Sequence, residues 1–191
     1  MTNGPNMIRR SLLFLVVTVL MAACAGSQPA DPGFAEISLQ DYKLDSGDRV
    51  RVTVFGQMDL SGEFSVDSGG RVALPLLEPV DARGKTTAEL ARGLEDSLRQ
   101  SLLRNPAVSI EITQYRPFFI LGEVMRPGQY AFVNGMTVRT AAAIAGGFTY
   151  RASMATVTIT RHTGGETKEG QAAIDAPVMP GDTIVVAERI F

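Results

Sequence analysis

The sequence has no tryptophan, one histidine and one cysteine, and each scarcity excludes something. One cysteine cannot form a disulfide within the chain. One histidine and one cysteine also fall short of the four ligands that a structural zinc site takes. Without tryptophan, only tyrosine and phenylalanine remain as sugar-stacking side chains. The sequence therefore predicts packed cores without disulfide or zinc cross-links.

Signatures of catalysis are absent as well. The sequence contains no Gly-x-Ser-x-Gly, no Walker A loop and no His-Glu-x-x-His. His162 stands between Arg161 and a Gly-Gly turn, where an exposed histidine is the simpler interpretation. The acidic residues between positions 45 and 67 lack the spacing of an EF-hand calcium loop. We therefore expect a protein that is not an enzyme and holds no cofactor or metal.

The N-terminus carries a short apolar segment that ends at the only cysteine. Arg9 and Arg10 precede a charge-free run over residues 11–23. That run is shorter than the roughly 20 residues that span a bilayer as a helix. Basic residues, an apolar run and small residues follow one another as in a secretory signal peptide. A cysteine at the first position after the cut resembles a bacterial lipoprotein signal, in which the thiol takes a diacylglyceryl group.

Two other interpretations of this segment stay open. An ordinary secretory signal fits the basic and apolar parts but leaves the position of Cys24 unexplained. A buried core cysteine fits poorly between Ala23 and Ala25, beside a Gly-Ser-Gln-Pro stretch. Met21 departs from the leucine that usually stands three residues before a lipidated cysteine. We predict that residues 1–23 are a lipoprotein signal peptide and that Cys24 is the lipidation site.

Cleavage there leaves 168 residues with 16 basic and 20 acidic side chains. This length suits one or two small domains with their own cores. The acidic balance argues against a nucleic-acid partner, whose phosphates require a basic surface. Residues 24–40 are small, polar and rich in proline and glycine, which predicts a flexible leader.

Hydrophobic periodicity predicts a first structured unit over residues 41–115. Alternation predicts strands at residues 49–55, 63–67, 71–74 and 108–113. The second and third of these are joined by a Gly-rich link, which predicts a hairpin. Thr86 and Glu89 form a candidate capping box for a helix with leucines at every fourth position from 90 to 102. Asn105-Pro106 ends that helix.

A second unit is predicted over residues 116–191. Strands are expected at residues 118–121, 130–133, 156–160 and 183–187. Pro127-Gly128 has the preference of a type II turn. Thr137 can cap a short helix over residues 138–145, which Gly146-Gly147 would terminate.

One sequence echo links the two units. Gly47-Asp48 and Gly181-Asp182 each open a strand, and Pro180 precedes the second pair. In such a turn glycine relieves backbone strain and the aspartate bonds to nearby amides. Two unrelated turns of a common type would look the same in the sequence.

Taken in order, these stretches resemble the outer-membrane polysaccharide export family, the Wza-like export lipoproteins. The residues of its motifs are Gly47, Asp48 and Pro75 in the first unit, and Gly122, Pro127, Gly128, Gly146, Gly147, Pro180, Gly181 and Asp182 in the second. The resemblance implies an α+β fold. A small export-type α/β domain would occupy residues 41–115, and a β-grasp-like SLBB (soluble-ligand-binding β-grasp) domain residues 116–191.

The resemblance also implies a function. In this family, lipidated subunits form a ring on the periplasmic face of the outer membrane, around a passage for capsule or exopolysaccharide. The ring docks on an inner-membrane polysaccharide co-polymerase. This chain would then be a lipid-anchored homo-oligomer whose motif residues are scaffold, with polysaccharide as the transported partner. Ala25 agrees with the outer membrane, since an aspartate after the lipidated cysteine would indicate inner-membrane retention.

Two departures from the family pattern qualify this expectation. Glu78 stands where relatives usually have glycine. The chain ends at Phe191, directly after its last predicted strand, whereas the best-known members continue into an amphipathic pore helix. We therefore expect a separate outer-membrane β-barrel partner to supply the pore. The alternative function is a lipid-anchored periplasmic glycan- or ligand-binding module without a conduit.

Overall fold

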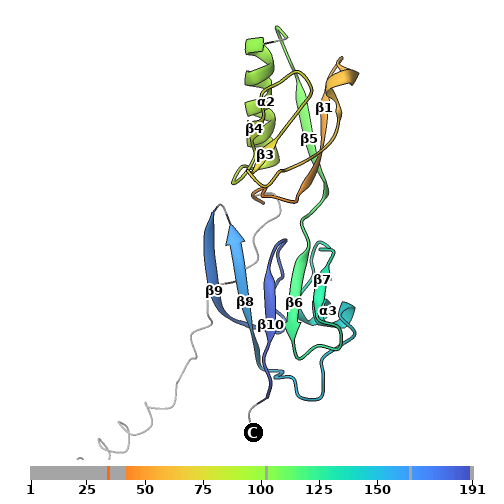
Figure 1. Cartoon of the computed structure of the whole chain (residues 1–191), viewed down its shortest axis with the longest axis vertical. Coiled ribbons are helices and arrows are strands. Elements are labelled where there is room, and N and C mark those ends of the chain that lie inside the picture. The colour runs from red at the N-terminus through yellow and green to blue at the C-terminus, as the bar shows by residue number, and fades with distance from the viewer. Residues whose placement is uncertain (1–33, 35–41, 102, 164, 190–191) are drawn as a thin grey trace, which may run out of the picture. The chain divides into compact units, whose positions relative to one another are not determined.

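The computed structural model describes Phe34 and residues 42–101, 103–163 and 165–189 (Figure 1). Their fold is α+β, as predicted, and contains a three-stranded sheet, a five-stranded sheet and a small two-stranded ribbon. The predicted signal peptide and Cys24 lie outside the described residues. No helix in the described part of the chain is long and apolar enough to cross a membrane.

The first sheet is antiparallel, with the order β2-β1-β5. Its strands are β1 (Arg49–Val54), β2 (Gly62–Ser65) and β5 (Val108–Gln114), and the 3-10 helix η4 (Met58–Leu60) connects β1 to β2. Helix α2 (Thr87–Ser101) runs along β5 (Figure 1). Alternate valines of β1 and every fourth residue of α2 are buried in one shared core: Val50, Val52, Val54, Leu90, Leu94 and Leu98. The side chains that the strand alternation and the helical leucine spacing predict to be buried therefore pack against each other.

The predicted hairpin over residues 63–74 is wrong. The turn itself closes, because the Arg71 amide donates to the Asp67 carboxylate at 2.8 Å and the Gly70 amide to the Asp67 carbonyl at 2.9 Å. Beyond the turn, however, β2 pairs with β1, and β3 (Arg71–Val72) pairs with β4 (Val80–Asp81). The backbone edge of β1 pairs with β2 over Gly62–Ser65, which leaves β3 to pair with β4.

Helix α2 begins with the predicted capping box. The Glu89 carboxylate accepts from the Thr86 amide at 2.7 Å, and the Thr86 hydroxyl accepts from the Glu89 amide at 3.2 Å. Lys43 donates to the same carboxylate at 3.1 Å. The Thr86 amide, followed by Lys43 and the Thr86 hydroxyl, lowers the pKa of Glu89 from 4.5 to about 2.

We expect this cap to make stability depend on acid pH. Because the folded-state pKa is depressed, the Glu89 contribution is present above pH 4.5 and is lost as the pH falls towards about 2. The difference in free energy of unfolding between wild type and Glu89→Gln should therefore shrink across that window. Urea unfolding at a series of pH values measures it, with the exposed Glu78→Gln as control. A difference that stays constant down to pH 2 would contradict the prediction.

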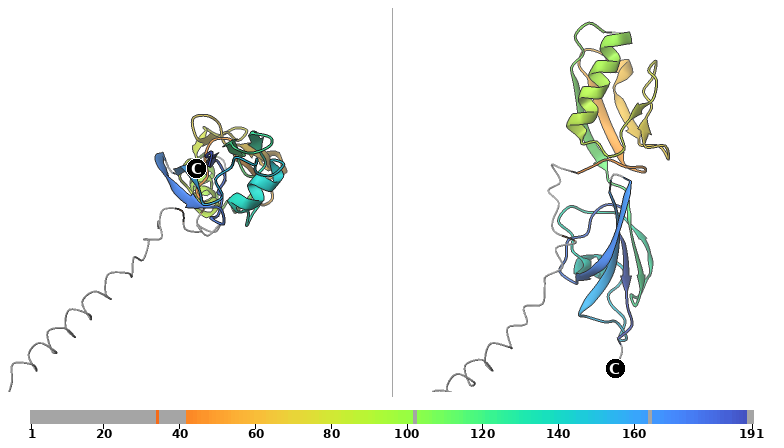
Figure 2. Two further views of the ribbon diagram at one scale, coloured as in Figure 1. Left: turned by 90° about the horizontal axis from the view of Figure 1, so that it is seen from below. Right: turned by 90° about the vertical axis from the view of Figure 1, so that its left-hand side faces the viewer.

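The second sheet has the order β7-β6-β10-β8-β9. Its strands are β6 (Phe118–Gly122), β7 (Gly128–Tyr130), β8 (Thr156–Thr163), β9 (Glu166–Ala173) and β10 (Thr183–Val186). Strand β10 runs parallel to β6, and the other neighbours are antiparallel. Helix α3 (Val138–Ile144) packs its buried residues into the same core as one face of this sheet (Figure 2).

Helix α3 begins and ends as predicted. The turn predicted at Pro127-Gly128 is not formed. Thr137 caps α3, and Gly146 and Gly147 take left-handed φ values of 89° and 96° after it. A type II turn would need positive φ at Gly128. Gly128 instead starts β7 in extended pairing with Ile120, so the predicted type II turn is wrong, and β7 ends at Tyr130 rather than continuing to residue 133.

Candidate functional site

The first Gly-Asp turn leads directly into β1. Gly47 has a φ of 93°, a left-handed conformation in which the missing Cβ avoids a steric penalty. The Asp48 carboxylate accepts from the Asp45 amide at 2.9 Å, and the Asp48 amide donates to the Asp45 carbonyl at 3.1 Å. The aspartate thus closes the turn that precedes its own strand.

The second Gly-Asp turn leads into β10 and has the same closure. Gly181 has a φ of 83°. The Asp182 carboxylate accepts from the Met179 amide at 2.8 Å, and the Asp182 amide donates to the Met179 carbonyl at 3.1 Å. The sequence echo is therefore also a repeated local structure, used once at each sheet.

The carboxylate of Asp48 is fully buried and surrounded by donors. The Tyr42 hydroxyl lies 2.8 and 3.0 Å from its two oxygens, and the Arg116 amide donates at 2.8 Å. Burial raises the pKa of the Asp48 carboxyl, while amides of Asp45 and Arg116 act in the opposite direction. Burial and the Asp48 charge raise the pKa of the Tyr42 hydroxyl, which therefore stays a donor.

The carboxylate of Asp182 is fully buried as well, and Arg161 on β8 neutralises it. The Arg161 Nε lies 2.9 Å from Oδ1 and its Nη2 lies 2.8 Å from Oδ2, a bidentate pair. The same Nη2 donates to the Pro177 carbonyl at 3.0 Å. Both aspartates are therefore satisfied within the chain, an arrangement suited to support rather than to catalysis.

Arg116 lies between the two Gly-Asp turns. Its Nη1 is 3.6 and 3.7 Å from the carboxylates of Asp48 and Asp45, and its Nη2 donates to the His162 carbonyl at 3.1 Å. A Cβ at Gly181 would fall 2.3 Å from the Arg116 Nε, closer than any real contact. The Arg116 side chain would therefore have to move if residue 181 carried a Cβ.

Aromatic and apolar contacts reinforce the same junction. The rings of Tyr42 and Tyr115 meet edge to face at 5.1 Å, and Tyr115 meets Phe132 in the same way at 5.4 Å. Such pairs contribute about 0.5–1.5 kcal/mol beyond area burial. Met179, from the turn before β10, is buried in the core of the first sheet. We call this set of contacts around Arg116 the junction.

A double-mutant cycle should show that Arg116 explains the glycine at position 181. We expect Gly181→Ala to lose about 1–3 kcal/mol more stability in wild type than in Arg116→Ala, where the clash is gone. The remaining loss in that background is the strain of positive φ. Urea unfolding of the four proteins measures the coupling. If the two losses of stability are additive, Arg116 does not restrict the side chain at position 181.

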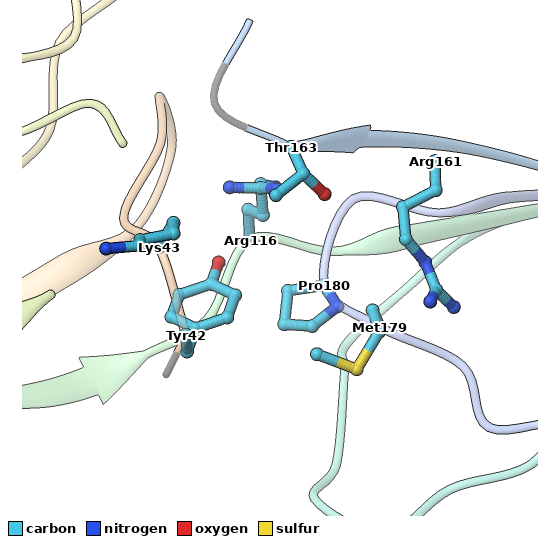
Figure 3. Close-up of a pocket in the computed structure, with 7 residues that line it drawn as sticks. All are labelled: Tyr42, Lys43, Arg116, Arg161, Thr163, Met179 and Pro180. Carbon is cyan, nitrogen blue, oxygen red and sulfur yellow. The ribbon is translucent and has the colours of Figure 1, made fainter. Parts of the chain in front are cut away.

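A small hollow opens at the junction, with Tyr42, Arg116 and Pro180 around it (Figure 3). Its volume is about 30 Å³, room for only about one or two water molecules. Its other lining residues are Lys43, Arg161, Thr163 and Met179. The hollow is too small for a sugar ring.

The motif glycines Gly122, Gly146 and Gly147 meet elsewhere, at the end of β6. Gly122 has a φ of 82°, and a Cβ there would lie 2.1 Å from the Val186 carbonyl oxygen. The loop after Gly122 is held to the end of α3, since the Met125 amide donates to the Gly147 carbonyl at 2.9 Å. These glycines thus join a strand end to a helix end.

The remaining motif residues are spread over the fold. Pro127 and Gly128 lie at the start of β7, and Pro75 is an exposed residue between β3 and β4. The structure therefore gathers Gly47, Asp48, Pro180, Gly181 and Asp182 at the junction and leaves Pro75 apart from it.

Two arginines of the site were not predicted from the sequence. Arg161 follows Val157 and Ile159 on the buried face of β8, so the alternation offered a signal for an inward charge. For Arg116 the sequence offers no signal beyond its position directly before Pro117. Their carboxylate partners are far away in the sequence, which local patterns do not reveal.

His162 is exposed on β8, next to the turn rather than in it. Its Nδ1 lies 2.8 Å from the Thr167 hydroxyl across the hairpin. Within the described ranges, no group of three His, Cys, Asp or Glu side chains is placed to hold a metal ion.

Comparison with known proteins agrees with this architecture. The polysaccharide biosynthesis/export protein family matches residues 37–113, and the SLBB domain matches residues 117–172. The boundary between the two matches falls beside Arg116. The chain belongs to the Wza-like polysaccharide export protein family.

Two curated relatives have related sequences. The exopolysaccharide production protein ExoF of Rhizobium meliloti is 31% identical over 140 residues, which is 67% of this chain and 32% of the relative. The polysialic acid transport protein KpsD of Escherichia coli is 28% identical over 123 residues, 61% of this chain and 22% of the relative. The chain therefore spans a third or less of the length of these relatives.

Proposed function

We propose that this protein is a lipid-anchored subunit of a polysaccharide export channel at the periplasmic face of the outer membrane. The observation that supports this most is the consecutive match to an export domain and an SLBB domain over residues 37–172. The names of the relatives agree, since one serves exopolysaccharide production and the other polysialic acid transport. Export of a polysaccharide needs a passage for the polymer and no cleavage of a covalent bond.

The junction supports the role of an assembly subunit. Its two aspartates and Arg161 are buried, and the aromatic contacts join the first sheet to the second. Such contacts fasten the two sheets to each other at several points, as a wall built from repeated copies requires. We propose that copies of the chain form a ring around the polymer and that the ring engages an inner-membrane co-polymerase.

Deletion of the gene, followed by measurement of surface polysaccharide, tests the proposal. We expect export to fall severalfold and to return with the wild-type chain or with Met21→Leu, which gives the signal its usual leucine. Cys24→Ser should fail to restore export, because the chain then lacks its lipid. Normal export from Cys24→Ser would show that anchoring is not needed.

A glycan-binding module without a conduit has one observation in its favour. A groove of about 480 Å³ lies along β1 and β2, beside the exposed ring of Phe55. Ligand pockets commonly have volumes of about 300–1,000 Å³, and an exposed ring can stack on a sugar. If Phe55→Ala abolishes polysaccharide binding by a protein that stays monomeric in detergent at all concentrations, this alternative is favoured over the channel.

A further inference from the structure

Phe34 is the one described residue of the predicted flexible leader, and it is not exposed. Only 5% of its surface reaches solvent. It belongs to the core cluster of the second sheet, together with Phe118 and Ile159. The rest of residues 24–40 lies outside the described residues. The leader precedes the first sheet in the sequence. Its Phe34 side chain nevertheless lies in the core of the second sheet.

Two cations on the β8–β9 hairpin hold the ring. The Arg161 Cζ lies 5.1 Å from the ring centroid and the Lys168 Nζ lies 5.9 Å from it. Arg161 and Lys168 are directly opposite each other in the β8–β9 register, so both reach the ring from one place on the hairpin. Contacts of this kind between a cation and an aromatic face are favourable, more so when they are desolvated.

Contacts that do not involve Phe34 hold Arg161 in place beneath the ring. Arg161 is 6% exposed, and the bidentate pair with Asp182 fixes the orientation of its guanidinium. A planar guanidinium fixed in this way offers a flat surface on which an aromatic ring stacks. The second Gly-Asp turn therefore has two roles, since the arginine that neutralises its aspartate also supports Phe34.

We propose that Phe34 is a docking residue that fastens the leader of the same chain to the β8–β9 hairpin. The lipid-anchored leader then joins the protein body at the second sheet, not at Tyr42 where the first begins. The consequence for the membrane rests on the proposed lipidation of Cys24. The ten residues from Cys24 to Phe34 reach at most about 35 Å, whereas the eighteen to Tyr42 would reach about 63 Å.

The absence of tryptophan makes this docking measurable. Phe34→Trp in the Cys24→Ser protein introduces a single indole, and Val133→Trp provides a matched control at a site that is 59% exposed. We expect the emission of Phe34→Trp to be blue-shifted and its acrylamide quenching to be severalfold weaker than in the control. Equal emission and quenching in the two proteins would overturn the proposal.

Hydrogen exchange provides a second measurement in case the indole is too large. Phe34→Ala should speed amide exchange severalfold in β8 and β9 and leave β1 and α2 unchanged. Exchange equal to wild type throughout would count against docking. Neither this measurement nor the fluorescence depends on lipidation or export, so they can fail or succeed separately from the proposed function.

Two insertions test the consequence in cells. Ten Gly-Ser residues placed between Cys24 and Phe34 lengthen the tether to the second sheet, and the same insertion between Phe34 and Tyr42 does not. We expect surface polysaccharide to fall with the first insertion and with Phe34→Ala, and to stay normal with the second insertion. Equal export from the two insertions would contradict a tether that is fixed at Phe34.

Discussion

Asp182→Ala should lower the free energy of unfolding by about 3–5 kcal/mol, because it leaves Arg161 buried without a counter-charge. The side chains of this pair are 6% and 0% exposed, so bulk solvent compensates poorly for the lost carboxylate. The Met179 amide loses its acceptor in the same variant. Urea unfolding measures the change.

The matched control is the pair of Arg139 and Asp175. It has the same two kinds of side chain and a distance of 2.8 Å, but its members are 53% and 69% exposed. Exposed pairs contribute only about 0–1 kcal/mol, so Asp175→Ala should have little effect. Adding Arg161→Met to Asp182→Ala removes the uncompensated charge and should recover part of the loss. Equal losses in the two single variants would refute the assignment of a buried pair.

Gly122→Ala should be at least as damaging, with a loss of about 4 kcal/mol or more. The added Cβ would lie 2.1 Å from the Val186 carbonyl oxygen, a backbone atom held in the β6–β10 pairing. That oxygen also accepts from the Glu123 amide at 2.9 Å. The clash can be relieved only by moving apart the paired ends of β6 and β10, two central strands of the second sheet.

Gly135→Ala separates this clash from backbone strain. Gly135 has a φ of 77°, close to the 82° of Gly122, but no atom lies within 4 Å of an added Cβ. Alanine there should lose only about 1–2 kcal/mol, the penalty for the left-handed conformation. Thermal and urea unfolding of both variants provide the comparison. If the two variants lose the same stability, strain alone explains the glycine at position 122.

Some elements could be predicted because their signals are local. The alternation of β1 placed Val50, Val52 and Val54 on one face, and the Thr86–Glu89 box placed the start of α2. Strand β9 was missed for the complementary reason. It is a polar edge strand in which only Ala172 is buried, so no apolar alternation marks it. Charged side chains along such an edge discourage pairing with other chains.

The pairing errors have a different cause. Residues 67–71 do form the predicted turn, yet the strands on either side of it find different partners. A turn signal states where the chain reverses, and the surrounding core decides which strands then pair. The type II turn predicted at Pro127-Gly128 was wrong for the same reason, because Gly128 pairs with Ile120 of β6 as part of a strand.

The sequence by itself determined the α+β class, the capped helices, the two Gly-Asp turns and the resemblance to polysaccharide export proteins. Each of these depends on residues that are neighbours along the chain. Only the tertiary structure decided that Asp48 receives the amide of Arg116, 68 positions away, and that Phe34 docks over Arg161. Buried charges and rings are stabilised by partners that neutralise or cover them, and those partners are chosen by proximity in space.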